Sequence, residues 1–230
     1  MGCAMQRFQP ILATLTLLSW LAVPLAASAQ QPESPAGQET IEVVAFGDSL
    51  VAGYGVGPDE AFPAQLEAAL RSAGYDVAVT NAGVSGDTTT GGLARLDWSV
   101  PESADLVIVE FGANDALRGV SPQIAADNLD QIVATLKKRG QKMILAGMMA
   151  PPNMGRDYQA TFDTIYPRLA EKYDVALYPF FLDGVAAETA LNQDDAMHPN
   201  PAGVAIIVER MLPTVTASLD AIIARRETTD

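Results

Sequence analysis

One serine in this chain follows an apolar run in a way that suits nucleophilic catalysis. The run "VAFGDSL", residues 44–50, passes from apolar residues to Gly47, Asp48 and Ser49. A strand that stops at the glycine and leads into a helix would place the Ser49 hydroxyl and its backbone N–H at the helix N-terminus. A serine hydroxyl is a weak nucleophile until a base accepts its proton. Taken alone, Ser49 is more simply a helix cap, so the chemistry depends on a base elsewhere.

The only histidine of the chain, His198, is the candidate base. A lone histidine is more often a surface or core residue, but Asp195 precedes this one by three positions. In a tight turn, or in the first turn of a helix, side chains at that spacing lie on one face. The Asp195 carboxylate can then accept from Nδ1–H and leave Nε2 free to accept a proton. Pro199, Asn200 and Pro201 predict a rigid start to the last helix, with Asn200 as its cap.

Two further positions could stabilise negative charge on a carbonyl oxygen under attack. Asn114 can donate from its side-chain amide, and a glycine of "NAGVSGDT", residues 81–88, can donate from its backbone N–H. Loss of one such donor typically costs about 10²–10³ in rate. Gly83 and Gly86 both lie in that segment, and their position alone does not choose between them. Ordinary turn chemistry also explains these residues, so they count only in combination with Ser49 and His198.

Five apolar runs, rich in β-branched residues, are predicted to be buried strands of a parallel sheet. They cover residues 41–46, 77–81, 106–111, 142–148 and 175–178. Helical patterns cover residues 62–73, 121–139, 156–173 and 201–224, with a kink expected at Pro213. This alternation predicts an α/β protein, a three-layer α/β/α (flavodoxin-like) fold with a five-stranded parallel sheet. Sites of such sheets form beyond the carboxyl ends of the strands, where the polar loops fall.

The amino-terminal segment predicts export. Residues 1–29 combine Arg7, an apolar stretch over 11–23 and the closing triplet Ala27-Ser28-Ala29, as in a cleaved secretory signal peptide. A membrane anchor is the alternative, but the apolar stretch is shorter than the roughly 20 residues that a span needs. The polar, Pro-rich residues 30–40 predict a flexible leader, and residues 41–225 a single domain. The expected location is periplasmic or secreted, with no stable membrane insertion after cleavage.

Charge and composition exclude several classes of partner and cofactor. Without Arg7, 13 of the 14 basic residues remain against 28 acidic ones, a net charge of −15 that disfavours nucleic acid and anionic membranes. The single cysteine, Cys3, lies in the predicted signal, so no disulfide is expected. A metal site built on Asp48, Asp194 and Asp195 is a poor alternative, because one histidine and scattered carboxylates do not make a ligand set. No metal or cofactor is therefore expected.

The motifs together resemble the GDSL family of SGNH hydrolases, and within it the periplasmic thioesterase I, arylesterase and lysophospholipase branch. The resemblance runs from about Val43 to about Leu212. It rests on five segments: "AFGDSLVAGYG", "NAGVSGDTT", "EFGANDALRG", "YPRLAEKYDVALYPFF" and "NQDDAMHPN". The match of "SGD" to the family pattern selects Gly86 over Gly83.

This resemblance implies a role for each candidate residue in acyl transfer through an acyl-serine intermediate, without metal or cofactor. Ser49 would be the nucleophile, His198 the base and Asp195 its partner. The N–H groups of Ser49 and Gly86 and the side chain of Asn114 would form the oxyanion hole. Related enzymes act on aryl esters, acyl thioesters and lysophospholipids, so the expected partner is a small-molecule acyl ester or thioester.

The acyl group would need an apolar groove, which two loops could line. Residues 116–122 contribute Leu117, and residues 147–158 contribute Met149 and Pro151. Two rival functions stay open: a carbohydrate O-deacetylase on the same fold, and a non-catalytic periplasmic binding protein that retains it. Chain-length preference on nitrophenyl esters would distinguish a deacetylase from an esterase for longer acyl groups. Any esterase activity would exclude the non-catalytic binding protein. The oligomeric state is not evident from the sequence.

Overall fold

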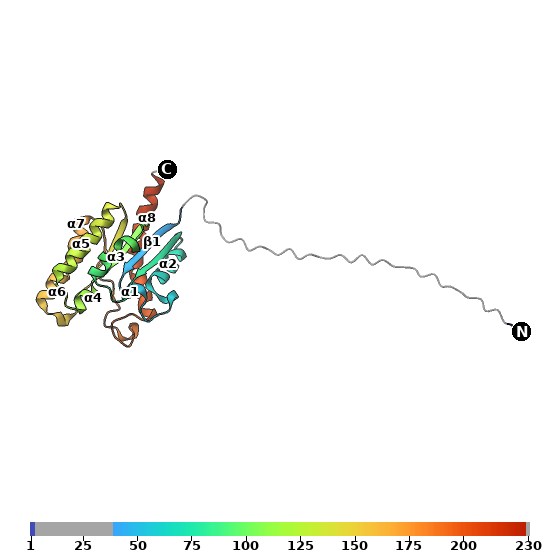
Figure 1. The fold of residues 1–230 in the computed structure, drawn as a ribbon, viewed down its shortest axis with the longest axis horizontal. Helices are drawn as coiled ribbons and strands as arrows, with labels where there is room; N and C mark the ends of the chain where they lie inside the picture. The colour runs from blue at the N-terminus through green and yellow to red at the C-terminus, as the bar shows by residue number, and fades with distance from the viewer. Residues whose placement is uncertain (3–38, 229–230) are drawn as a thin grey trace. The chain divides into compact units, whose positions relative to one another are not determined.

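Five parallel strands form the centre of the protein, for which a computed structural model describes residues 1–2 and 39–228 (Figure 1). The sheet has the order β2-β1-β3-β4-β5. Its strands are β1 (Ile41–Gly47), β2 (Val77–Gly83), β3 (Leu106–Glu110), β4 (Lys142–Ala146) and β5 (Ala176–Tyr178). All five predicted strands are confirmed, with ends displaced by one or two residues. Residues 3–38, which hold nearly all of the predicted signal peptide and most of the predicted leader, lie outside the described residues.

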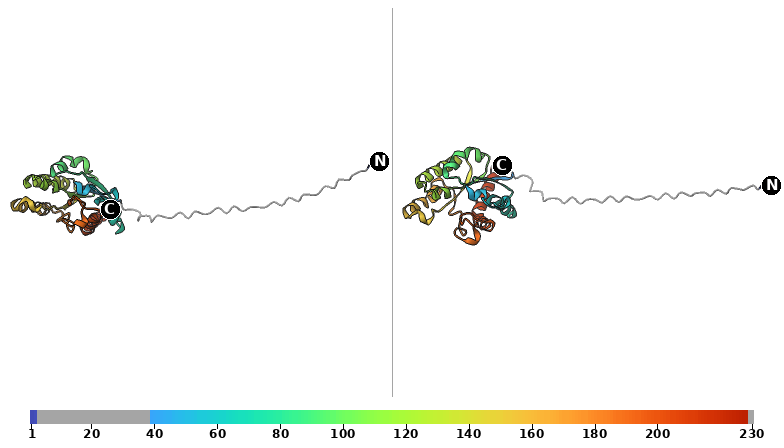
Figure 2. Two further views of the ribbon diagram at one scale, coloured as in Figure 1. Left: turned by 90° about the horizontal axis from the view of Figure 1, so that it is seen from below. Right: turned by 60° about the horizontal axis from the view of Figure 1, so that its bottom comes forward.

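The helices surround the sheet on both sides. They are α1 (Ser49–Ala52), α2 (Phe62–Ser72), α3 (Thr89–Ser99), α4 (Ala113–Leu117), α5 (Pro122–Lys138), α6 (Arg156–Phe162), α7 (Ile165–Tyr173) and α8 (Pro201–Glu227), with short 3₁₀ turns η1 (Pro58–Glu60), η2 (Pro152–Met154) and η3 (Thr189–Leu191). Helices α2 and α8 pack together on one face, while α3, α5 and α7 form the layer on the other (Figures 1 and 2). The predicted three-layer α/β/α fold is confirmed.

The direction of winding changes at the middle of the sheet. From β1 the chain passes through α2 to β2 on one side, then crosses through α3 to β3 on the other side of β1. The carboxyl ends of β1 and β3 therefore flank the topological switch point, where ligands of open parallel sheets bind. In strand register, Gly47 at the end of β1 stands opposite Glu110 at the end of β3.

Helix α8 is a core helix. It continues without a break across Pro213, where the sequence predicted a kink. Pro213 lies on the exposed side of the helix, so the carbonyl that it leaves unpaired can bond to water. The helix is long and apolar enough to span a membrane, but its buried residues recur every three to four positions, as on a face packed against a sheet. These are Gly203, Val204, Ile207, Val208, Met211, Val215, Leu219 and Ile222.

Two further features differ from the sequence prediction. Helix α3 was not predicted, because its glycine and threonine residues have weak helix propensity. It forms through packing: a Cβ on Gly92 would lie 2.6 Å from the Phe111 ring, so glycine permits the close approach to the core. The helix predicted over 156–173 is instead two helices, α6 and α7. Between them the Asp163 carboxylate accepts a hydrogen bond from the Ala150 N–H at 2.9 Å.

Candidate active site

Ser49 is the first residue of α1, directly after the turn that ends β1. The cap of this helix is Asp48, whose Oδ1 accepts from the Leu50 N–H at 2.9 Å. Ser49 is therefore not itself the cap, which was the simpler interpretation of the sequence. Its side chain is largely buried, and its Oγ lies 2.9 Å from His198 Nε2. The hydroxyl thus has a base within hydrogen-bonding distance.

His198 and Asp195 form the second link of the same chain of hydrogen bonds. Nδ1 of His198 lies 2.6 Å from Asp195 Oδ2, as the spacing of three predicted. The other carboxylate oxygen accepts from the backbone N–H groups of Met197 and His198, both at 3.0 Å. Hydrogen bonds from the backbone and imidazole of His198 and from Met197 lower the pKa of Asp195 to about 2. An ionised Asp195 holds Nδ1 protonated, which leaves Nε2 to accept from Ser49.

The turn that carries His198 is rigid at both ends. Asn200 caps α8 as predicted, accepting from the Gly203 N–H at 3.0 Å. Gln193 donates from its backbone to the His198 carbonyl at 2.8 Å, and its side-chain amide donates to the Tyr54 carbonyl at 2.7 Å. The Tyr54 ring also packs against the imidazole, with 4.6 Å between ring centres. Gln193 and Tyr54 join the segment after α1 to the histidine turn, and sequence reasoning missed both.

The structure separates the two candidate glycines. Gly83 ends β2, where an added Cβ would lie 2.2 Å from the backbone nitrogen of Ala52. Close packing under α1 therefore explains why Gly83 is a glycine. Gly86 lies in the following loop with a φ of 82°, and its carbonyl accepts from the Arg118 guanidinium at 2.7 Å. Gly86 remains the candidate for an oxyanion donor, and the contact with Arg118 was not predicted.

Asn114 lies in the first turn of α4, beyond the end of β3. Its amide Nδ2 donates to Asp48 Oδ2 at 2.9 Å, which uses one of the two amide hydrogens and leaves the second for a ligand. Asp48 is fully buried, and burial raises its pKa to about 6 despite the hydrogen bonds from Leu50 and Asn114. Asp48 thus joins the helix of the nucleophile to the amide of Asn114. The sequence contained Asp48 next to Ser49 but did not indicate this contact.

The two loops predicted to hold an acyl group pack against each other. The Tyr158 hydroxyl of the second loop donates to the Val120 carbonyl of the first at 2.7 Å. Leu117 and Met149 are both more than half exposed, at 54% and 52%. Pro151 is partly buried at the start of η2. Their role in binding substrate remains a proposal.

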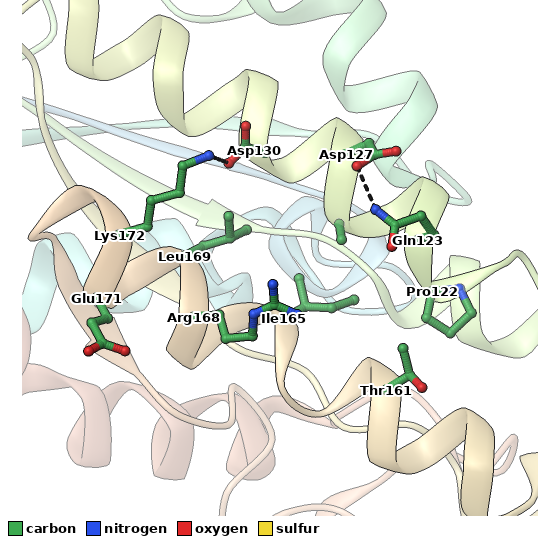
Figure 3. A pocket seen from close by; sticks show the side chains of 11 residues that line it. Pro122, Gln123, Asp127, Asp130, Thr161, Ile165, Arg168, Leu169, Glu171 and Lys172 are labelled. Carbon is green, nitrogen blue, oxygen red and sulfur yellow. Dashed lines mark hydrogen bonds and ion pairs between the residues drawn. The ribbon is translucent and has the colours of Figure 1, made fainter.

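A separate groove of about 470 Å³ lies between α5 and the pair α6 and α7 (Figure 3). Lys172 pairs with Asp130 across it, and Gln123 bonds Asp127 along one side. None of the predicted site residues lines this groove. Within residues 39–228, no group of three or more His, Cys, Asp or Glu side chains could hold a metal ion.

The fold and the hydrogen-bonded Ser49, His198 and Asp195 at its switch point describe a serine hydrolase with an α/β/α sandwich. Residues 45–206 match the model of the GDSL-like lipase/acylhydrolase family. The chain belongs to this family, and it is a carboxylic ester hydrolase.

Known proteins agree with this assignment. The chain is 40% identical to an arylesterase of Vibrio mimicus over 76% of its own length and 88% of the relative. It is 41% identical to the thioesterase 1/protease 1/lysophospholipase L1 of Escherichia coli over 67% of its own length and 74% of the relative. The crystal structure of AlinE4, an SGNH-hydrolase family esterase, is 49% identical, with a TM-score of 0.67 over 80% of this chain and 99% of that one.

Proposed function

We propose that this protein is a serine esterase that hydrolyses carboxylic esters with apolar acyl groups through an acyl-serine intermediate. The observation that carries the proposal is the continuous chain of hydrogen bonds from Ser49 Oγ through His198 to Asp195, at 2.9 and 2.6 Å. This is the arrangement in which a base activates a serine and a carboxylate orients the base.

The proposed reaction has two halves that use the same groups. Ser49 Oγ attacks the ester carbonyl carbon while its proton passes to His198 Nε2, and ionised Asp195 stabilises the imidazolium. The N–H groups of Ser49 and Gly86 and the free amide hydrogen of Asn114 bind the oxyanion. The tetrahedral intermediate then expels the alcohol or thiol, which takes the proton from His198. Water attacks the acyl-serine in the same way and releases the acid.

Exposed apolar side chains support an apolar acyl group. Among residues 39–228, five large apolar side chains that are exposed belong to segments that follow β1, β2, β3 or β4 or that adjoin His198. They are Tyr54, Val84, Leu117, Met149 and Met197. We infer that these side chains share the rim at the carboxyl ends of the strands, where they would favour ligands with apolar surface. The printed names of the relatives, arylesterase and thioesterase/lysophospholipase, suggest aryl esters, acyl thioesters or lysophospholipids as leaving-group classes.

A chain-length series tests the substrate proposal. The purified protein is assayed with p-nitrophenyl acetate, octanoate and palmitate, and then with an acyl-CoA and a lysophosphatidylcholine. We expect kcat/KM to be higher for octanoate than for acetate, because each buried CH₂ contributes about 0.8 kcal/mol. Activity on acetate alone would instead indicate an O-deacetylase. No hydrolysis of any of these compounds would indicate a binding protein.

We also propose that the protein acts in the periplasm or outside the cell. The proposal rests on the charge, apolar stretch and small-residue triplet of residues 1–29. Mass spectrometry of the protein from its own host should find an amino terminus at residue 30. An intact terminus in the membrane fraction would mean that the segment is an anchor.

A further inference from the structure

A buried glutamate beneath the candidate oxyanion hole has no role in the chemistry described above. Glu110 is the last residue of β3 and is fully buried. Its Oε2 accepts from the Asp48 N–H at 3.3 Å. A Cβ on the neighbouring Gly47 would lie 2.7 Å from that oxygen, so the glycine makes room for the glutamate. The carboxyl is thus built into the switch point, directly behind Asp48.

The surroundings of Glu110 offer little to stabilise a negative charge beyond the long hydrogen bond from the Asp48 N–H. Its second oxygen, Oε1, is buried and has no hydrogen-bond partner among the described residues. The neighbouring titratable groups are the Asp48 carboxyl and the Tyr166 hydroxyl, which donates to the Phe111 carbonyl. The nearby cation, Arg95, is bonded to Asp87 and to the Gly47 carbonyl. An ionised carboxylate with one long hydrogen bond and one unpartnered oxygen is very costly in such a place.

We propose that Glu110 is held as a neutral carboxylic acid that donates a hydrogen bond to the Asp48 carboxylate and thereby positions Asn114. Two adjacent buried carboxyls are most stable with one shared proton. Burial and the charge of Asp48 both raise the pKa of Glu110 well above its usual range, which agrees with this assignment.

The proton on Glu110 matters because it keeps Asp48 an acceptor only. The Asp48 carboxylate accepts from the Leu50 N–H and from Asn114 Nδ2. In the proposed arrangement it also accepts from the Glu110 hydroxyl, and an ionised carboxylate donates nothing. Asn114 must therefore present Nδ2 to Asp48, which determines the orientation of its second amide hydrogen. Glu110 is a positioning residue in this scheme. Its consequence for the rate rests on the proposed function, whereas its protonation state does not.

Three variants test the proposal. Glu110→Gln replaces the acid by a neutral amide that can still donate to Asp48. Glu110→Leu removes the donor and puts an apolar side chain of similar size in its place. Glu102→Gln is the matched control, because Glu102 is exposed and lies in the turn before the same strand. Unfolding in urea is measured for each protein at pH 5, 6 and 7, together with kcat and KM on a p-nitrophenyl ester.

The unfolding data report the proton directly. A carboxyl with a raised pKa in the folded state stabilises the fold at low pH and loses that contribution as pH rises above the unfolded value of about 4.3. The folding equilibrium constant of the parent should therefore fall about tenfold per pH unit relative to that of Glu110→Gln, until the native pKa of Glu110 is reached. Both proteins contain Asp48, so the difference isolates Glu110. Glu102→Gln should run parallel to the parent.

Kinetics and infrared spectroscopy complete the test. At pH 7, Glu110→Gln should keep kcat within about threefold, and Glu110→Leu should lose about tenfold in kcat with little change in KM, as for one lost hydrogen bond. The infrared carbonyl band of a protonated carboxylic acid should be present at pH 7 in the parent and in Ser49→Ala, and absent from Glu110→Gln. Unfolding curves of the parent and Glu110→Gln that stay parallel across pH, with no such band, would overturn the proposal even in an active enzyme.

Discussion

The Ser49 hydroxyl and the His198 imidazole lie 2.9 Å apart although 149 positions separate them in the chain. Ser49 follows the end of β1, and His198 precedes the start of α8, so both occupy the rim formed by the carboxyl ends of the strands. The Gln193 side chain links the two segments by donating to the Tyr54 carbonyl. The Ser49–His198 distance is therefore maintained by the hydrogen bond of Gln193 to Tyr54 in addition to the Ser49–His198 hydrogen bond itself.

Ser49→Ala should abolish most ester hydrolysis. Without Oγ no acyl-serine can form, and the remaining oxyanion donors supply only a small part of the rate. In hydrolases of this type the loss is at least about 10³-fold in kcat. The assay uses a p-nitrophenyl ester, with circular dichroism to confirm folding. Hydrolysis near the parental rate by the folded variant would mean that another group is the nucleophile.

Asp195→Asn should slow hydrolysis by about 10²–10⁴ in kcat. An amide can present its nitrogen to Nδ1 and so favour the tautomer in which Nε2 carries the proton and cannot accept from Ser49. The substitution Asp194→Asn is a matched control, because it removes the same charge from an exposed neighbouring residue. Because the pKa of Asp195 is about 2, its carboxylate should stay ionised throughout an assay from pH 5 to 9. Equal rates for the two variants would contradict the assigned role of Asp195.

The sequence predicted the groups that are defined by local spacing. Asp195 and His198 lie in one turn, Asn200 caps the following helix, and the strands appear as continuous apolar runs because both faces of the sheet are covered. The contacts of Asp48 with Asn114 and Glu110 depend on the register between β1 and β3, which are more than 60 residues apart. No local pattern encodes that register, so the polar groups behind the site could not be found from the sequence.

Substitutions at three glycines should separate packing from catalysis. Gly83→Ala places a methyl group 2.2 Å from the Ala52 nitrogen and should destabilise the fold by several kcal/mol, since backbone must move. Gly86→Ala has room, with its nearest neighbour at 3.5 Å, but its φ of 82° strains an alanine. It should cost about 1 kcal/mol of stability and lower kcat by tenfold or more, since the loop that presents its N–H is displaced.

Gly74→Ala is the control for the strain at Gly86. Gly74 has a φ of 95° and nothing within 4 Å of an added Cβ, and it lies between α2 and β2, away from the candidate site. The thermal stability of the Gly74→Ala protein should fall about as much as that of the Gly86→Ala protein, while its kcat stays unchanged. If Gly86→Ala lost no more activity than Gly74→Ala, an oxyanion role for Gly86 would be untenable.

Asp48→Asn should make the enzyme slower and change how its stability depends on pH. The carboxylate accepts on both oxygens, from Leu50 and from Asn114, whereas an amide accepts on one only. One contact must be lost, and if Asn114 turns over, its donor no longer serves the oxyanion, a loss of about 10²–10³ in kcat.

Burial raises the pKa of Asp48 to about 6. Parental stability should therefore decline relative to the variant as pH rises from about 4 to about 6, by about 3 kcal/mol. Urea unfolding at pH 4, 5, 6 and 7 measures this, with Asp194→Asn as the exposed control. Parallel stability curves together with full activity would show that Asp48 is neither buried as an anion nor holding Asn114.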